Sequence, residues 1–234
     1  MISFIVACYN EEKNITETIN SIILANRKLK DKKYEIIIID DHSTDNSKNI
    51  LNKLKKKFKF IKLKKNKKNL GYGGTVKVGI KKAKGDYVIW IPGDNSHASS
   101  ELVKILKYKN KYDIVSTFYT NTETRSRFRN NFTKFYTPIL NILFGLNLPY
   151  YNGVTLIKKK IFSKFNIVTN SHSFHLEIWV NIFLINKYSI KFVPTLLNDR
   201  IKGATAFKFK NSVKVLFNFL RLYFYFLFKK LKIF

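Results

Sequence analysis

The amino-acid sequence predicts an α/β fold built on a largely parallel central sheet. Short apolar runs, typical of strands buried on both faces, alternate in the first half with longer stretches of helical periodicity. This alternation implies parallel strands joined by right-handed crossovers, with helices covering the sheet. Acidic clusters follow three of the runs and would meet at one edge of such a sheet. The expected strands are Ile2–Cys8, Tyr34–Ile39, Phe60–Leu63, Tyr87–Ile91 and Ile114–Tyr119.

Helices are expected between these strands. Asn14 followed by Glu17 is a helix-start pattern, and the isoleucines after it recur on one helical face. Further helices are expected to begin at Asp45 or Ser47, after Gly71, and near Leu102.

The second half of the chain differs in composition. Asn121–Asn131 is polar, whereas Phe132–Leu148 is apolar and aromatic. After an Asn-Gly turn, Val154–Ile157 is an expected strand. Ser171–Ile185 then holds a helical apolar stretch, and Lys191–Val193 is a further expected strand.

The chain is strongly basic. Its 234 residues include 44 Lys+Arg against 15 Asp+Glu, a formal charge of +29. Such a charge can indicate nucleic-acid binding, but only six of these residues are Arg and no nucleic-acid motif is present. We therefore expect no nucleic-acid partner, and the alternatives are a solvated lysine surface or attraction to anionic lipid headgroups. The single cysteine, Cys8, excludes an internal disulfide, and a cytoplasmic setting is expected.

The segment Gly85–His97, GDYVIWIPGDNSH, is the centre of the predicted site. Its apolar run breaks at Pro92 and delivers Asp94 at the end of a strand. Asp94 would join Glu11-Glu12 and Asp40-Asp41 at the carboxyl edge of the sheet, where open α/β sheets bind ligands. Carboxylate oxygens suit a hard divalent cation, which usually brings phosphates with it. Independent helix caps are the alternative interpretation of these acids.

Two further features have more than one interpretation. The loop 71–74, GYGG, could bare backbone N–H groups for an anion, helped by Lys67 or Lys68, or could serve turn geometry alone. His172 and His175 have a metal-like spacing, but isolated pairs of this kind are usually structural, and we assign no zinc to them.

Several motifs together resemble those of family 2 glycosyltransferases. ACYNEE after the first strand is similar to their YNEE opening, and IIIDDHSTDNS is similar to their DDxSxD segment. NKKNLGYGGTVKVGIKKAKGDYVIWIPGDNSH is similar to the region that ends in their DxD motif. The resemblance covers about the first 120 residues. It implies the GT-A fold, a Rossmann-like single domain that binds a nucleoside-diphosphate sugar and a divalent metal, Mg²⁺ or Mn²⁺.

The second half resembles dolichyl- or polyprenyl-phosphate sugar transferases. YYNGVTLIKK, FHLEIWVNIFLINKYSIKFVP and NDRIKGATAFK are similar to three segments of that subgroup. The resemblance implies a lipid-linked acceptor and a membrane surface as partners. It also implies a catalytic domain over residues 1–209, in which residues 1–120 bind the nucleotide sugar and residues 121–209 form the acceptor side. A helix over residues 210–234 would follow this domain.

The resemblance assigns roles to individual residues. The nucleotide-sugar group comprises Ala7, Tyr9, Glu11, Asp40, Asp41, Gly71, Gly73 and Lys202. The metal group is Asp94 with Ser96, and the catalytic group is Asp94, Arg200 and Glu177. The acceptor phosphate would be met by Arg125, Arg127 or Arg129.

The chain departs from the family pattern at several of these positions. Ala7 replaces a proline, and His42 replaces a glycine. Pro92 stands where the first Asp of DxD is expected, so Asp94 is the carboxylate that remains. Tyr150 or Tyr151 falls where an acid is common.

The function expected from the resemblance is inverting sugar transfer at the cytoplasmic face of a membrane. A polyprenyl phosphate acceptor needs no strong base, whereas a hydroxyl acceptor would need one, and Glu177 and Asp113 are the candidates. A glycosyltransferase that acts on a hydroxyl of a surface polysaccharide is the first alternative. A non-catalytic basic binding protein is the second. The sugar, the nucleotide and the oligomeric state stay open.

The tail Lys210–Phe234 is expected to form an amphipathic helix. Its apolar stretch Val213–Phe228 falls short of the roughly 20 residues that a bilayer span needs. Polar residues recur every three or four positions and would form one narrow stripe: Asn211, Lys214, Asn218, Arg221 and Tyr225. We expect the helix to lie in the membrane interface with its lysines at the headgroups; packing on the domain or on another subunit is the alternative.

Overall fold

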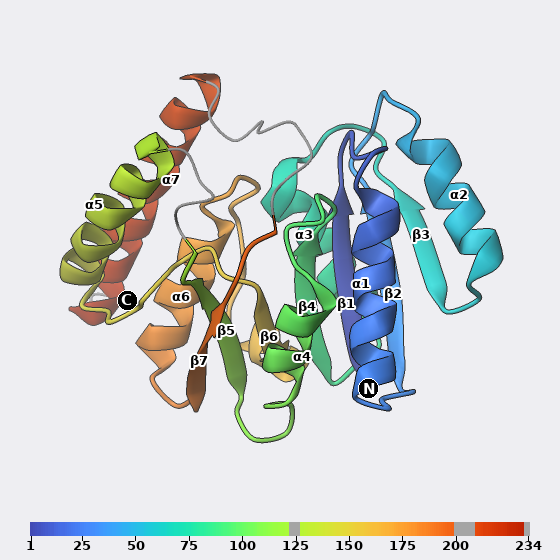
Figure 1. Ribbon diagram of the computed structural model, residues 1–234. Coiled ribbons are helices and arrows are strands. Elements are labelled where there is room, and N and C mark those ends of the chain that lie inside the picture. The colour runs from blue at the N-terminus through green and yellow to red at the C-terminus, as the bar shows by residue number, and fades with distance from the viewer. Residues whose placement is uncertain (122–126, 199–208, 232–234) are drawn as a thin grey trace.

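The computed structural model describes residues 1–121, 127–198 and 209–231, and within them a seven-stranded sheet is covered by helices on both faces (Figure 1). The strand order is β3-β2-β1-β4-β6-β5-β7. All neighbouring strands pair in parallel except β6, which is antiparallel to both β4 and β5. The predicted α/β fold with a mostly parallel sheet is confirmed.

The boundaries follow the predicted pattern closely. The strands are β1 (Ile2–Cys8), β2 (Tyr34–Asp40), β3 (Ile61–Lys65), β4 (Tyr87–Pro92), β5 (Ile114–Tyr119), β6 (Thr155–Lys158) and β7 (Ile190–Thr195). The helices are α1 (Ile15–Lys28), α2 (Ser47–Lys57), α3 (Gly71–Lys82), α4 (Ser99–Leu106), α5 (Arg127–Phe144), the 3₁₀ helix η2 (Lys159–Lys164), α6 (Phe174–Ile185) and α7 (Phe209–Lys230).

Alternate residues of the central strands enter two separate cores. Ile5 and Trp90 face the core formed with α3 and α6, whereas Phe4 and Ile89 face the core formed with α1, α2 and α4. All four side chains are buried. Because both faces of the sheet are covered at its centre, β1, β2 and β4 are nearly unbroken apolar runs, and the sequence revealed them for that reason.

Helix α7 packs on the domain. Leu222 and Phe226 are buried in the core that α6 and α5 also line, and α7 runs beside α5 (Figure 1). Three residues of the polar stripe bond to the domain: Asn218 donates to Ser171 (3.2 Å), Arg221 to Thr169 (2.8 Å) and Tyr225, which is also partly exposed, to Asn181 (3.1 Å). Packing of the helix on the domain, the alternative interpretation of the sequence, therefore holds for these three residues, and contact of the helix with a membrane stays a prediction. The side chains of Asn211 and Lys214 are not among those described.

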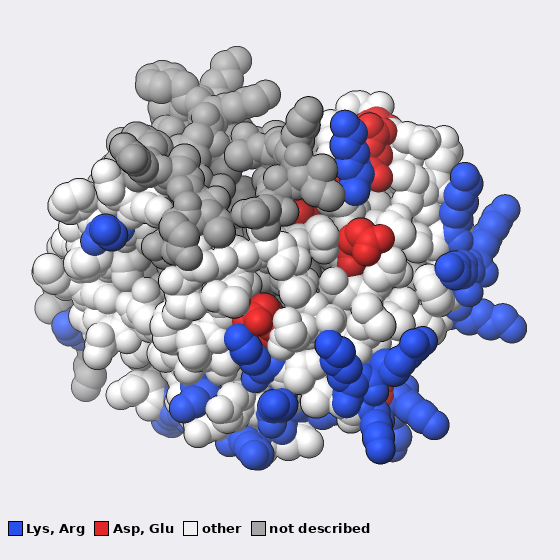
Figure 2. Space-filling model, viewed as in Figure 1, with Lys and Arg blue, Asp and Glu red and all other residues white. Residues whose placement is uncertain are grey.

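The basic charge is spread unevenly over the surface. In Figure 2 lysine and arginine side chains gather at the right, over α2, and along the lower edge, whereas the surface over α5 at the left is largely uncharged. Within the residues that the structure describes, no helix combines the length and the apolar character that a bilayer span requires.

Candidate active site

The predicted site lies at the carboxyl ends of three adjacent strands. β1 is paired with β2 on one side and β4 on the other, so that Cys8 lies opposite Asp40 and Ala7 opposite Pro92. The acidic clusters after these strands therefore leave the sheet side by side, as the sequence predicts. Each strand is followed by a left-handed residue, namely Asn10 (φ 56°), His42 (φ 68°) and Asn95 (φ 56°). This conformation is strained for a residue with a side chain and concentrates at functional edges.

The acids after β1 fasten two loops together. Glu11 accepts a hydrogen bond from Asn14 (2.8 Å), and its backbone N–H donates to Ser47 (2.9 Å). Glu12 accepts from the backbone N–H of Asn46 (2.9 Å) at the start of α2. Tyr9 lies between these contacts and the sheet edge with an exposed ring. In this arrangement Glu11 ties the loop after β1 to α2, and the ring of Tyr9 is open to solvent. Contact of these two residues with a nucleotide sugar stays a prediction.

Asp41 holds the start of α3 in place. One of its carboxylate oxygens accepts from the Asn66 side chain (2.8 Å) and from the backbone N–H of Leu70 (2.8 Å), and the other accepts from the N–H of Gly71 (2.9 Å). Asp40 is also buried and accepts from the backbone of the loop after β2 (2.9 Å). Both aspartates lie at the expected edge of the sheet, and their visible partners belong to the protein. Direct contact with the base or ribose stays a prediction.

Residues 71–74, expected as a loop, form the first turn of α3, and their glycines permit close packing. The N–H of Gly71 is bound to Asp41, and the N–H of Gly74 donates to the carbonyl of Asn170 (3.1 Å). A Cβ atom at Gly73 would lie 2.7 Å from both the Phe174 Cβ and the Ser171 carbonyl oxygen. Since two of these N–H groups are engaged inside the protein, the structure favours turn and packing geometry over a bare anion cradle at Gly71 and Gly74.

Tyr72 is a feature of the site that the sequence did not reveal. Its ring stacks on His172 (centroids 5.1 Å apart) and on His175 (5.7 Å). Burial raises the pKa of Tyr72, and the negative charge of Asp94 raises it further, so the phenol stays protonated. Burial, with repulsion from His172, lowers the pKa of His175 to about 3. The two histidines of the His-x-x-His pair are therefore structural, since both stack on Tyr72. The one sign of this stack in the sequence is a tyrosine among the glycines of residues 71–74.

Asp94 is the part of the site with the donor chemistry of a metal ligand. It lies just beyond β4, partly exposed, and its Oδ1 accepts from the hydroxyl (2.6 Å) and the N–H (3.2 Å) of Ser96. The described residues contain no cluster of three or more His, Cys, Asp or Glu that could hold a metal ion. Mg²⁺ is commonly bound by one or two carboxylates together with substrate phosphates and water. Asp94 with Ser96 therefore fits an ion that arrives with a diphosphate.

Sequence comparison assigns the chain to a family. The family model described as "Glycosyl transferase family 2" matches residues 3–165. The chain belongs to glycosyl transferase family 2. The matched region runs from β1 to η2 and includes every strand that lines the predicted edge.

Curated relatives within family 2 are glycosyltransferases. The poly(ribitol-phosphate) beta-glucosyltransferase of Bacillus spizizenii is 34% identical over 116 residues, which are 48% of this chain and 18% of that protein. The cholesterol galactosyltransferase of Borreliella burgdorferi is 35% identical over 122 residues, 50% of this chain and 32% of that protein. A poly(ribitol-phosphate) beta-N-acetylglucosaminyltransferase of Staphylococcus aureus is 29% identical over 198 residues, 81% of this chain and 60% of that protein. The chain thus spans less than two thirds of each of these relatives.

Solved structures of the GT-A fold align with almost the whole chain. Glucosyl-3-phosphoglycerate synthase from Mycobacterium tuberculosis, solved with Mn²⁺, uridine diphosphate and phosphoglyceric acid, aligns with a TM-score of 0.70 at 18% identity, covering 95% of this chain and 78% of that one. The same synthase solved with Mg²⁺ and uridine diphosphate aligns with a TM-score of 0.69 at 16% identity, covering 95% of this chain and 79% of that one. The expected GT-A fold is confirmed.

Glu177, expected near the acceptor, is buried and fully engaged. Its carboxylate accepts from the backbone N–H groups of Val168 (3.1 Å) and Thr169 (2.7 Å) and from Arg221 of α7 (3.2 Å). It therefore joins α6, the 168–171 segment and α7. This position gives Glu177 a positioning role, and a part in proton transfer stays a prediction.

The arginines and the lysine predicted to bind phosphate groups lie outside the described residues or have side chains that are not described. Arg125, Arg200 and Lys202 fall outside the described residues, and Arg127 and Arg129 belong to the first turn of α5 without described side chains. Asn198, the last described residue before Arg200, bonds the backbone of Ser96 (3.0 Å) and of Asn95 (3.2 Å). The described chain therefore ends beside the Asp94 loop, two residues before Arg200.

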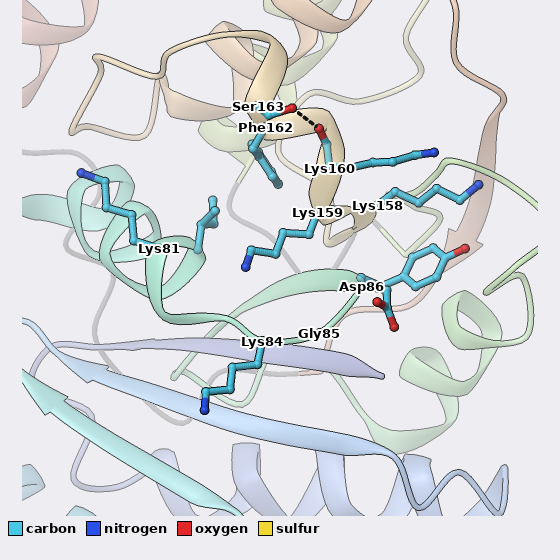
Figure 3. Close-up of a pocket in the computed structure, with 11 residues that line it drawn as sticks. Lys81, Lys84, Gly85, Asp86, Lys158, Lys159, Lys160, Phe162 and Ser163 are labelled. Carbon is cyan, nitrogen blue, oxygen red and sulfur yellow. Dashed lines mark hydrogen bonds between the residues drawn. The ribbon is translucent and has the colours of Figure 1, made fainter.

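Two pockets lie outside the Asp94 loop. A pocket of about 730 Å³ opens at the amino edge of the sheet, opposite the predicted site, between the start of β4 and η2 (Figure 3). Its lining includes Lys81, Lys84, Lys158, Lys159 and Lys160. A smaller pocket of about 290 Å³ lies at the carboxyl end of β5, beside α5.

The smaller pocket is connected to the candidate site through aromatic rings. Tyr119 and Tyr150 line it and contact each other edge to face (5.1 Å), and Tyr119 stacks on His97 of the loop after Asp94 (5.9 Å). Lys134 of α5 adds a positive charge to the same lining. Rings, hydroxyls and one cation are a suitable lining for part of a sugar or phosphate acceptor.

Proposed function

We propose that this member of family 2 transfers a sugar from a nucleoside-diphosphate sugar to an acceptor, with inversion at the anomeric carbon. The observation that carries the proposal is that Asp94, to which the sequence resemblance gives the metal, lies beside the acidic ends of β1 and β2 in a member of this family. A basic binding protein would have no use for three acidic strand ends brought together in a molecule of charge +29. We take residues 1–209 as the catalytic domain and 210–234 as its appended helix.

The residues of the site divide the work as follows. Tyr9 offers its exposed ring to the base, and Asp41 fixes the loop that borders the nucleotide. Asp94, steadied by Ser96, holds a divalent cation, which when bound neutralises the departing diphosphate. Arg200 and Lys202 add positive charge to the same group, from a segment that starts beside Asp94.

The acceptor that best suits the chain is a polyprenyl phosphate at the cytoplasmic face of a membrane. A hydroxyl acceptor needs a base, and both candidates have other tasks. Glu177 is held by backbone N–H groups and Arg221. Asp113 lies at the opposite edge, where bonds from Lys158 and Ser189 outweigh its partial desolvation and lower its pKa to about 2. A phosphate is anionic near neutral pH and attacks without such a base.

A hydroxyl of an anionic glycopolymer is the second candidate acceptor. The names of two relatives, which refer to poly(ribitol-phosphate), favour it. The lysine-rich surface would attract either acceptor, since both carry phosphate.

The test is sugar transfer with a panel of nucleotide sugars, each offered with polyprenyl phosphate or with a poly(ribitol phosphate) chain. We expect EDTA to abolish transfer and Mg²⁺ or Mn²⁺ to restore it. Asp94→Asn should reduce kcat by at least about 100-fold, the scale of losing a main electrostatic group. Asp86→Asn, at the opposite edge and 77% exposed, is the matched control and should keep full activity. Full transfer by Asp94→Asn would refute the assignment.

A further inference from the structure

Helices α5 and α7 present large apolar side chains to solvent. On α5, Ile142 is 80% exposed and Phe135 is 72% exposed. On α7, Phe217 is 69% exposed. We call this surface the α5–α7 face, and its exposed members are Phe135, Ile139, Ile142, Phe217, Leu220, Phe224, Phe228 and Leu231. Such a cluster of exposed rings and branched chains marks an interaction surface rather than ordinary scatter.

The two exposed stripes lie on neighbouring helices that pack together. The ring of Phe144 on α5 contacts three rings of α7, those of Phe219, Tyr223 and Phe226, at centroid distances of 5.4 to 6.0 Å. On each helix the exposed members recur every three or four residues, so each helix has one apolar side inward and another outward. α5 and α7 form the left-hand layer of the molecule (Figure 1).

The charges around the face fit an anionic partner. Neither α5 nor α7 contains an acidic residue, whereas Lys134, Lys229 and Lys230 are exposed on them. The surface over α5 is accordingly white with isolated blue in Figure 2. Two copies of such a face would bring like charges together, which is costly across an interface. A bilayer with anionic headgroups instead offers acyl chains to the rings and negative charge to the lysines.

We propose that the α5–α7 face docks on the surface of an anionic lipid bilayer, with its exposed rings and branched side chains in the interface and its lysines among the headgroups. No described helix is long and apolar enough to cross the bilayer, so the two helices lie along it. The anchor is thus a folded surface to which α5 contributes, and the inward polar side of α7 takes no part in lipid binding. The pocket lined by Lys134, Tyr119 and Tyr150 adjoins α5 and would face a lipid-linked acceptor; this last point rests on the proposed function.

The test is co-sedimentation of the full chain with vesicles of phosphatidylcholine containing 30% phosphatidylglycerol, compared with phosphatidylcholine alone. We expect binding to the anionic vesicles that falls at high salt. Phe135→Ser with Ile142→Ser should weaken it at least tenfold, since about 0.8 kcal/mol is lost per methylene kept out of the acyl region. Leu24→Ser, an exposed apolar residue of α1, is the matched control and should bind as wild type.

The outcomes separate docking from catalysis. Both α5 side chains are exposed, so the variant should keep the wild-type unfolding temperature; if it does not, Phe217→Ser with Phe224→Ser tests the same face on α7. Wild-type vesicle binding by both double variants overturns the proposal. The proposal is also overturned if the wild type does not bind vesicles but forms a concentration-dependent dimer that these variants abolish. Asp94→Asn should bind vesicles normally, so that a failed transfer reaction leaves the docking result intact.

Discussion

Glu177→Gln distinguishes a positioning role from a catalytic one. The carboxylate of Glu177 is 3% exposed and accepts three hydrogen bonds, from the N–H groups of Val168 and Thr169 and from Arg221. Glutamine has the same shape but carries an amide NH₂ in place of one oxygen. That NH₂ would face a backbone N–H, so one buried donor loses its acceptor.

The expected loss of stability follows from these contacts. A hydrogen bond to a charged group contributes about 1.5–3 kcal/mol, and an unsatisfied buried donor costs about 1–3 kcal/mol. The Arg221 pair adds only about 0.5–1 kcal/mol, because the Arg221 side chain is 33% exposed and solvent screens the ion pair. We expect Glu177→Gln to lower the free energy of unfolding by about 2–4 kcal/mol in total.

Denaturant unfolding measures this loss, and transfer kinetics complete the test. At a temperature where the variant is folded, we expect kcat within about tenfold of wild type, since no proton passes through Glu177 in the proposed reaction. Glu17→Gln, an exposed acid on α1, is the control and should change stability by less than about 0.5 kcal/mol. Wild-type stability together with a loss of more than about 100-fold in kcat would refute this reasoning and make Glu177 the base.

Three more changes probe the same region. The pKa of His175 is about 3 in the native chain and about 6.5 in the unfolded chain, so between these pH values His175 is protonated only after unfolding. The free energy of unfolding should therefore fall by about 1.4 kcal/mol for each unit by which the pH is lowered below about 6.5. In urea unfolding at pH 4.5–7, the variant His175→Phe should show a smaller dependence of the unfolding free energy on pH than wild type. His172→Gln, at an exposed position, should keep the wild-type dependence. The same pH dependence in both variants would count against the prediction. In Gly73→Ala the added Cβ would lie 2.7 Å from the Cβ of Phe174, so the free energy of unfolding should fall by about 1–3 kcal/mol. Nucleotide binding, measured by calorimetry, should weaken as well. A variant with wild-type stability and affinity would contradict the packing argument. His42→Gly should raise the unfolding free energy by up to about 1 kcal/mol by relieving the left-handed conformation at φ 68°, and a loss would show that the imidazole makes a compensating contact.

The central strands were predictable because burial on both faces leaves a continuous apolar run. Ile2–Cys8 is the same range in sequence and structure, and Tyr34–Ile39 differs from β2 by one residue. The direction of β6 was not predictable, because an apolar run does not encode which way the strand crosses the sheet. The start of α3 was marked by its glycines, whose purpose, contact with Ser171 and Phe174, depends on a segment about 100 residues later.

The candidate site was predictable in place and less so in detail. Parallel topology brings the ends of β1, β2 and β4 together, so Asp94 and Asp41 were placed correctly at one edge. The partners of Asp41 and Glu177 are backbone N–H groups of distant loops, which leave no local pattern in the sequence. The tail helix was recognised by its period, but period alone does not say which side faces the protein. The buried acid Glu177 decides it by pairing with Arg221.

Substitutions on the inward side and on the outward side of α7 should therefore affect different properties of the protein. On the inward side, Asn218 and Arg221 bond to the 169–171 segment, which packs on Gly73 and so borders the proposed nucleotide site. Asn218→Ala with Arg221→Met should weaken nucleotide affinity and leave binding to anionic vesicles near wild type. Phe217→Ser with Phe224→Ser should do the reverse, because these exposed rings make no part of that chain of contacts. If both pairs weaken both properties equally, α7 acts as a single stabilising element, and the division between a side that braces the nucleotide site and a side that meets lipid does not hold.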